Sequence, residues 1–239
     1  MFSFSKRSNE KELLDGLNIP MEQIRRNMYE LDVINSRLGG HAITLRGLKQ
    51  VLKHRVNTQP VHVVEIGCGG GDNLRVVKRW AQKSGQAARL TGIDINPDCV
   101  DYAASRAGSE GIDFICDDYK TAKFAEPPDV IFSSLFCHHF SDEELVFMLR
   151  WMQQHTTAGF FINDLHRHPL AYYSIKTLTR LFSESDLVKN DAPLSVKRSF
   201  TRGDWQRYFS AAGIHHFSCR WQWAFRWLIT YTHDEATNI

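Results

Sequence analysis

The segment 61–74 constrains the fold of this chain more than any other. It begins with a short, β-branched apolar run, Val-His-Val-Val-Glu-Ile, and continues as Gly-Cys-Gly-Gly-Gly-Asp-Asn-Leu. The stretch 72–83 carries Leu74, Val77 and Trp80 on one side, which predicts a helix. Glycine permits positive φ and lets a ligand approach bare backbone, while a helix N-terminus offers free N–H donors. The sequence therefore predicts a strand–turn–helix unit of the kind that a nucleotide-like cofactor needs.

Strand-like and helix-like segments alternate along the chain around this unit. Short apolar runs predict strands at 61–66, 89–93, 112–116, 130–133 and 159–163, and amphipathic runs predict helices at 72–83, 97–107 and 141–155. Strands that alternate with helices in this way favour a parallel sheet covered on both faces. The chain is therefore predicted to be an α/β protein.

The two ends of the chain are predicted to add to this core. The first sixty residues have helical apolar spacing, interrupted at Gly39-Gly40, which indicates two helices meeting at a tight corner. The segment 217–227 alternates strictly, which predicts strand material, with a hairpin as one arrangement and its tryptophans packed in the core. We expect a helical arm or lid at 1–59, and a core at 60–239 with an insert at about 164–203 that forms a substrate wall.

Composition narrows the class of protein. Lys and Arg total 29 against 27 for Asp and Glu, a balance too even to predict a nucleic acid or an anionic membrane as partner. The five cysteines are odd in number and include no Cys-x-x-Cys pair, which argues against a disulfide scaffold or a zinc ribbon. The N-terminal residues lack the apolar core of a signal peptide, and no run approaches the roughly 18–20 apolar residues of a membrane span. We expect a soluble, cytoplasmic protein.

Two carboxylates near the glycine turn narrow the class of cofactor that it could bind. Glu65 lies two residues before the first glycine, and Asp94 ends the next predicted strand, where a carboxylate can accept both hydroxyls of a ribose. The order Glu-x-Gly-x-Gly-x-Gly followed by strand–Asp resembles the class I S-adenosylmethionine-dependent methyltransferases, over residues of about 61–231. A nicotinamide dehydrogenase fits less well, because Asp72 stands where the third glycine of its G-x-G-x-x-G fingerprint belongs.

The resemblance implies a fold and a cofactor. The fold is a Rossmann-like, doubly wound, mostly parallel seven-stranded sheet with an antiparallel closing strand, preceded here by the N-terminal helical arm. The cofactor is S-adenosylmethionine, with S-adenosylhomocysteine as product. Glu65 would reach toward the methionine end, Asp94 would hold the ribose and Ile95 would lie against the adenine. Asp117 would bond the adenine amine, a role that Asp118 could fill instead, with a solvated loop as the alternative for both. The other residues that we assign to the cofactor site are Gly67, Cys68, Gly69, Gly71, Ser133, Arg37 and Gly40.

The loop after the fourth strand narrows the acceptor class. It lacks the Asn/Asp-Pro-Pro-aromatic motif of the adenine and amide N-methyltransferases. It has Ser133 where the metal-dependent catechol methyltransferases have Asp, and Asn163-Asp164 reverses their later Asp-Asn, so we predict no metal. The run 133–140 resembles the small-molecule branch, whose members act on quinones, phenols and polyketides. The segments 34–45, 163–173 and 191–200 resemble a bacterial subgroup associated with phenolic-lipid and polyketide biosynthesis. For His138 and His139 we favour a structural or orienting role, with a zinc ligand or a base as the alternative.

The expected reaction is methyl transfer to the oxygen of a phenolic or polyketide-type small molecule. Our leading base is His166, because it follows the fifth strand on the side where ligands bind, with His168 second and Asp164 orienting either imidazole. The alternative is that these three residues only cap the loop and the next helix. C-methylation of a quinol-like metabolite and a catalytically silent cofactor-binding protein both stay open. We expect no nucleic-acid partner, and either a monomer or a homodimer.

Overall fold

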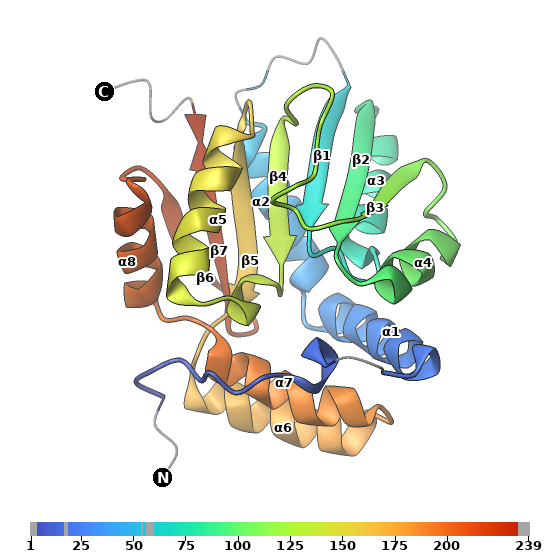
Figure 1. The fold of residues 1–239 in the computed structure, drawn as a ribbon, viewed down its shortest axis with the longest axis vertical. Coiled ribbons are helices and arrows are strands. Elements are labelled where there is room, and N and C mark those ends of the chain that lie inside the picture. The colour runs from blue at the N-terminus through green and yellow to red at the C-terminus, as the bar shows by residue number, and fades with distance from the viewer. Residues whose placement is uncertain (1–3, 17–18, 54, 56–59, 234–239) are drawn as a thin grey trace.

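One seven-stranded sheet forms the centre of the protein, in a computed structural model that describes residues 4–16, 19–53, 55 and 60–233 (Figure 1). In chain order the strands are β1 (Val61–Ile66), β2 (Ala88–Asp94), β3 (Ile112–Cys116), β4 (Val130–Ser134), β5 (Gly159–Leu165), β6 (Ser218–Gln222) and β7 (Arg226–Thr232). Their order across the sheet is β3-β2-β1-β4-β5-β7-β6. β7 is antiparallel to both of its neighbours, and the other pairs are parallel. The predicted fold class is confirmed.

Helices cover both faces of the sheet. In chain order they are α1 (Met21–Arg37), α2 (Gly40–Val51), α3 (Asp72–Ser84), α4 (Pro97–Ser105), α5 (Asp142–Gln154), α6 (Pro169–Phe182), α7 (Asp186–Arg198) and α8 (Arg202–Ala212), with short 3₁₀ helices η1 (Leu13–Asp15) and η2 (Cys137–His139). The apolar sides of α2 and α3 form one core with β1 and β4, and those of α5 and α8 form another on the opposite face. The strands therefore alternate between two buried faces, which explains their continuous apolar character.

Local signals in the sequence account for where several of these elements begin. Ser141 and Glu144 form a capping box at the start of α5, and Asn96 caps α4, whose first residue is Pro97. Gly39 has a φ of 79° between α1 and α2, so the predicted corner between two helices is confirmed. The segments predicted as strands and helices between residues 61 and 163 are all present.

A third layer lies at the edge of the sheet where β1 and β4 end. Figure 1 shows α1, α6, α7 and the N-terminal segment with η1 gathered below that edge. The predicted insert forms α6 and α7, which pack on each other, and α7 also contacts α1 and η1. Because ligands of open α/β sheets bind outside the carboxyl ends of the strands, this layer covers the place where a ligand is expected.

The run 217–227 forms the hairpin of β6 and β7, as the sequence offered, with a turn at 223–225. The burial of its tryptophans departs from the prediction. Trp227 is buried as predicted, but Trp221 is 45% exposed and Trp223 is 71% exposed. The prediction of core packing is wrong for these two tryptophans, because β6 is an edge strand and Trp223 lies in the turn.

None of the helices in the described part of the chain combines the length and the apolar character needed to cross a membrane.

Candidate functional site

A large cavity of about 1170 Å³ lies between the carboxyl edge of the sheet and the third layer. Its floor is the glycine turn after β1 together with the residues that follow β2 and β4. Its cover comes from η1, α1, α6, α7 and the turn between β6 and β7. Two groups of polar side chains line it, one beside the glycine turn and one beside η2, with apolar side chains between them.

The glycine turn is tied to the next strand through Asp94. The backbone N–H of Gly69 donates to Asp94 Oδ2 at 2.8 Å, and that of Asn96 donates to Asp94 Oδ1 at 2.9 Å. Gly67 has a φ of 64°, and a Cβ there would lie 2.1 Å from a ring carbon of Phe136. No side chain other than hydrogen fits at this position, so the turn requires glycine for its conformation and for its packing. Burial raises the pKa of Asp94.

Glu65 is a buried carboxylate with one oxygen left over. It is 1% exposed, and its Oε1 accepts a hydrogen bond from Asn73 Nδ2 at 3.0 Å. Its Oε2 has no hydrogen-bond partner in the part of the chain that the structure describes. Burial, reinforced by the charge of Asp72, raises the pKa of Glu65 well above its usual value. A buried polar atom without a partner is costly, so Oε2 is a ready acceptor for a donor that enters the cavity.

Arg226 lines the same cavity with a buried guanidinium. It is 2% exposed, and it donates to Asn35 Oδ1 at 2.8 Å and to Asn163 Oδ1 at 3.5 Å. Within the described residues, no carboxylate forms an ion pair with it. Burial lowers the pKa of Arg226 to about 10. A buried cation without a counter-ion is costly, so this end of the cavity favours an anion.

A chain of buried hydrogen bonds connects Arg226 to Glu65. Asn163 Nδ2 donates to Thr44 Oγ1 at 3.3 Å, Thr44 donates to Asn73 Oδ1 at 2.9 Å, and Asn73 in turn donates to Glu65. The two charged groups are thus held by one network against one wall. A carboxylate oxygen without a hydrogen-bond partner and a guanidinium without an ion-pair partner among the described residues, linked by this network, complement the ammonium and carboxylate of an α-amino acid.

A second, smaller pocket of about 140 Å³ adjoins Asp94 and Ile95. Asp117 and Asp118 line it together with Tyr119. Asp117 Oδ1 already accepts from the backbone N–H of Asp118 and from Thr121 Oγ1, both at 2.8 Å. Ile95 is 71% exposed and lies at the border of both cavities.

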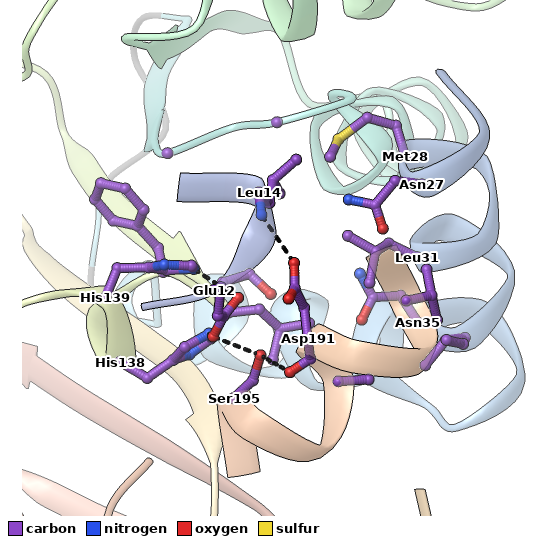
Figure 2. Close-up of a pocket in the computed structure, with 18 of the residues that line it drawn as sticks. Glu12, Leu14, Asn27, Met28, Leu31, Asn35, His138, His139, Asp191 and Ser195 are labelled. Atoms are coloured by element: carbon purple, nitrogen blue, oxygen red, sulfur yellow. Dashed lines mark hydrogen bonds and ion pairs between the residues drawn. The ribbon is translucent and has the colours of Figure 1, made fainter. Parts of the chain in front are cut away.

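A second group of polar side chains in the cavity lining surrounds Glu12. Figure 2 shows Glu12 from the N-terminal segment beside His138 and His139 of η2, with Met28 and Leu31 of α1 across the cavity. Glu12 Oε1 lies 3.6 Å from His138 Nε2, and Glu12 Oε2 lies 3.9 Å from His139 Nε2. We call Glu12, His138 and His139 the acceptor-end cluster.

Neighbouring side chains hold the acceptor-end cluster in place. Ser195 Oγ donates to Glu12 Oε1 at 2.8 Å, and both oxygens of Asp191 accept from the backbone N–H groups of Leu13 and Leu14. Burial raises the pKa of Glu12 to about 7, against the lowering effect of His139. Glu12 therefore ionises near neutrality.

Most of the predicted cofactor residues lie together, and some do not. Those that line the large cavity are Glu65, Gly67, Cys68, Gly69, Asp94 and Ile95, and those in the smaller pocket beside it include Asp117 and Asp118. Four others lie outside both linings. Gly71 turns away at the start of α3, Arg37 is exposed on α1, and Ser133 is buried with its Oγ 3.3 Å from Cys137 Sγ. A Cβ on the fourth, Gly40, would lie 3.2 Å from the guanidinium of Arg226, so this glycine makes room for that side chain.

The predicted catalytic histidines lie outside the cavity lining. His166 packs against Trp227 with ring centroids 4.9 Å apart, and burial together with His168 lowers its pKa to about 4. His168 Nδ1 accepts from the backbone N–H of Leu170 at 3.2 Å, so it caps α6. Asp164 turns away from both and accepts from His138 Nδ1 at 2.8 Å. β5 continues to Leu165 and directs His166 toward β7, so the structure places the expected base outside the lining of this cavity.

Sequence reasoning missed Glu12 and Arg226. Glu12 carries no local signal, because it precedes a single 3₁₀ turn in a charged stretch. Arg226 lies in the alternating C-terminal run, where a charged residue opposite Trp227 is expected to face water. The strand is covered on both faces, so Arg226 is buried instead. A charged residue within a strand that has apolar residues on both faces would have been the signal.

Comparison with known proteins agrees with this architecture. Residues 63–159 match the family model described as "Methyltransferase domain". Among curated proteins, the chain is 30% identical over 81 residues to a malonyl-[acyl-carrier protein] O-methyltransferase of Acetivibrio thermocellus, covering 34% of this chain and 27% of that protein. It is 34% identical over 80 residues to a trans-aconitate 2-methyltransferase of Streptomyces avermitilis, covering 31% of this chain and 28% of that protein. The matched region thus spans little more than a quarter of these relatives.

Solved structures share the fold over most of the chain. The plantazolicin methyltransferase BpumL, solved with a desmethylplantazolicin analogue and S-adenosylhomocysteine, aligns with a TM-score of 0.60 at 20% identity, over 83% of this chain and 72% of that one. An S-adenosylmethionine-dependent methyltransferase from Aquifex aeolicus aligns with a TM-score of 0.58 at 15% identity, over 90% of this chain and 99% of that one. Residues 63–159 thus match a methyltransferase domain, and the chain shares its fold with these methyltransferase structures.

Proposed function

We propose that this protein binds S-adenosylmethionine and transfers its methyl group to an oxygen of a small molecule of phenolic or polyketide type. The observation that carries the proposal is the charge pattern beside the glycine turn. Glu65 Oε2 and the Arg226 guanidinium are buried, lack counter-ions among the described residues, and lie on one hydrogen-bonded wall next to Asp94. A zwitterionic amino acid joined to a nucleoside complements this pattern.

The residues present fit the cofactor group by group. Glu65 would accept from the ammonium, whose charge would keep that carboxylate ionised despite its burial. Arg226 would bond the carboxylate in place of water. Asp94 would accept from the ribose hydroxyls, and the smaller pocket with Asp117 and Asp118 would take the adenine edge. When bound, the cofactor supplies a methyl group already activated on a sulfonium.

The protein's own task is then alignment and exclusion of water. The N-terminal segment and α1 cover the cavity, and apolar side chains from α1 and α6, such as Leu31 and Leu178, form its middle. This composition suits a flat apolar acceptor with a polar group at one end. The acceptor-end cluster would receive that polar group, and Asp164 would fix the His138 ring so that Nε2 faces it.

One relative supports oxygen as the atom that is methylated. The malonyl-[acyl-carrier protein] methyltransferase is named as an O-methyltransferase, although it matches over 81 residues only. The acceptor-end cluster supports the same choice, since carboxylate and imidazole groups bond a hydroxyl readily.

Calorimetric titration with S-adenosylhomocysteine tests the cofactor site. We expect micromolar binding by the full chain and at least about tenfold weaker binding by Glu65→Gln, Asp94→Asn and Arg226→Met, because each loses a charged hydrogen bond worth roughly 1.5–3 kcal/mol. Arg37→Ala is the control, because this exposed residue lies outside the cavity. Thermal unfolding without ligand checks that each variant is folded. Absence of binding by the wild-type protein would refute the proposal.

A panel of acceptors then tests the reaction. We expect turnover with hydroxylated aromatic compounds, and an O-methyl product identified by NMR. Turnover confined to quinol carbon would establish C-methylation instead. Tight cofactor binding without turnover on any acceptor would favour a protein that binds the cofactor without chemistry.

A further inference from the structure

We propose that Glu12, His138 and His139 form a binding site for one divalent transition-metal ion, such as Zn²⁺, at the acceptor end of the cavity. The site differs from the one that the sequence argued against. That expectation rested on Ser133 and on the order Asn163-Asp164, and neither set belongs to the acceptor-end cluster.

The orientation of the two imidazoles is the first argument. His138 Nδ1 lies 2.8 Å from Asp164 Oδ1, and His139 Nδ1 lies 3.0 Å from Asp15 Oδ1. A carboxylate at Nδ1 holds a proton there, so in the neutral ring, which is the form that binds a metal, the lone pair is on Nε2. Both Nε2 atoms face the carboxylate of Glu12. Histidine ligands of metals are held by carboxylates in this same manner.

The separations between the three ligand atoms are the second argument. One ligand atom from each of the three residues lies within 4.8 Å of those of the other two. His138 Nε2 is 3.6 Å from Glu12 Oε1, and His139 Nε2 is 3.9 Å from Glu12 Oε2. Ligands about 2.1 Å from a tetrahedral zinc ion are roughly 3.4 Å apart. The two Nε2-to-oxygen distances of 3.6 Å and 3.9 Å exceed that spacing by only about 0.2 and 0.5 Å.

The charge around the cluster is the third argument. The carboxylates that contact the two imidazoles are those of Glu12, Asp15 and Asp164, and the guanidinium that reaches two of them is that of Arg198, 3.2 Å from Asp15 and 4.0 Å from Glu12. With Glu12 ionised and both imidazoles neutral, these four groups carry a net charge of minus two. Asp191 and Arg7, which donates to the carbonyl oxygen of His138, both lie nearby, and their charges offset each other. A divalent cation offsets this charge in a site where burial makes unbalanced charge costly.

The choice of metal follows from the ligands. Two imidazoles and one carboxylate favour Zn²⁺, Fe²⁺, Co²⁺ or Ni²⁺ over Mg²⁺, which prefers oxygen ligands. Three protein ligands leave at least one position open, as in catalytic zinc sites. All three residues line the cavity, so the open position is accessible to an oxygen of the acceptor. This last point rests on the proposed function, whereas metal binding itself does not.

The experiment uses the full chain after treatment with a chelator. Titration with Zn²⁺ is followed by calorimetry, and titration with Co²⁺ by its visible absorption, which reports ligand type and geometry. We expect one ion per chain, and at least about tenfold weaker binding after Glu12→Gln, His138→Gln or His139→Gln. His41→Gln is the matched control, because Asp32, His41 and Asp72 form a cluster of similar spacing that is only half-buried.

The outcomes separate the two proposals. Unchanged metal binding by the Glu12, His138 and His139 variants, or its loss in the His41 variant, would overturn the metal site. Binding of S-adenosylhomocysteine by the same variants shows that they are folded. Cofactor binding without metal binding in the wild-type protein refutes the metal site alone, while metal binding without cofactor binding refutes the proposed function alone.

Discussion

His138 in η2 and His166 after β5 show how the hydrogen bond at Nδ1 determines whether an imidazole can act in the cavity. His138 is 3% exposed, has a carboxylate at Nδ1 and presents Nε2 to the cavity. His166 lies against Trp227, and its Nδ1 has no partner among the described residues. Burial lowers the pKa of His166 to about 4, so this ring is neutral at physiological pH.

We therefore expect opposite results from two equivalent substitutions. His166→Gln should leave kcat and cofactor affinity within about twofold of wild type, because the ring lies outside the lining of both cavities described above. His138→Gln should lower kcat by 10²-fold or more while cofactor affinity stays the same, in the range typical for an acid–base or metal-ligating group. Steady-state kinetics with the best acceptor, combined with calorimetry, measures both. Loss of turnover in the His166 variant alone would restore the base expected from the sequence.

At the scale of single residues, the sequence predicts those site residues whose position follows from the backbone. Glu65 and Asp94 end neighbouring parallel strands, so their place at one sheet edge follows from the fold. Glu12 reaches the site because the N-terminal segment crosses to α7, where Ser195 and Asp191 hold it. No local pattern encodes that crossing, so the acceptor end could not be predicted.

Among the elements, α2 packs closely on the sheet because one of its residues is a glycine. Gly47 lies within α2, and a Cβ there would come within 2.5 Å of the Phe161 ring on β5. Glycine within a helix costs about 1 kcal/mol relative to alanine. The close approach of helix and sheet offsets this cost through better packing.

Alanine substitutions at two helical glycines should therefore have opposite effects. Gly47→Ala should lower the free energy of unfolding by about 1–3 kcal/mol, because overpacking outweighs the gain in helix propensity. Gly203→Ala in the first turn of α8 should raise it by about 0.5–1 kcal/mol, because its Cβ would meet no atom closer than 3.8 Å. Urea unfolding at constant pH measures both. A Gly47 variant as stable as wild type would show that α2 can move away from the sheet.

The sequence predicts elements whose apolar residues recur with a regular period and which begin at a capping residue. It does not locate a turn that lies within such a regular pattern. The strands and helices from 61 to 163 have both signals. The run 217–227 keeps its alternation through a turn, so only the structure reveals that Trp223 is in the turn and lines the cavity.

For the whole molecule, the N-terminal segment is a strap that connects distant parts of the chain. Arg7 donates to Asp142 Oδ1 at 3.0 Å and to the carbonyl oxygen of Phe140 at 2.8 Å. Arg198 donates to the carbonyl oxygen of Glu10 at 2.8 Å, and Asp191 bonds the backbone of η1. The strap covers the cavity and buries one of its own carboxyl groups there. The free energy of unfolding therefore depends on whether that group is ionised.

That group is Glu12, and its raised pKa makes stability depend on pH. The pKa of Glu12 is about 7 in the folded protein against a usual value of 4.5. The folded state therefore keeps this proton to a higher pH than the unfolded state does. The contribution of Glu12 to stability is therefore fully present below about pH 4.5 and is lost as the pH rises through 7. In metal-free protein, Glu12→Gln should be comparable to wild type at pH 4.5 and more stable at pH 8, by up to about 3 kcal/mol.

Urea unfolding of both proteins between pH 4.5 and 8, in the presence of a chelator, measures this difference. Taking the difference between the two proteins removes the contributions of the other titrating groups. A difference that does not change with pH would show that folding leaves the pKa of Glu12 at its unfolded value. Added Zn²⁺ should reverse the order at pH 8, because the ion needs the ionised carboxylate and stabilises the wild type alone.

The position of β7 has a consequence for how the protein is made. This strand lies between β5 and β6, yet it is translated after both. The nascent chain therefore presents the apolar edge of β5, with Phe160 and Ile162, from the time that β5 emerges from the ribosome until residues 226–232 follow. At 5–20 residues per second this interval lasts roughly 3–13 s, long enough for an unpaired edge to meet another nascent chain. Pauses in translation before β7 thus increase the risk of aggregation, while rapid completion of the hairpin closes the edge within the same molecule.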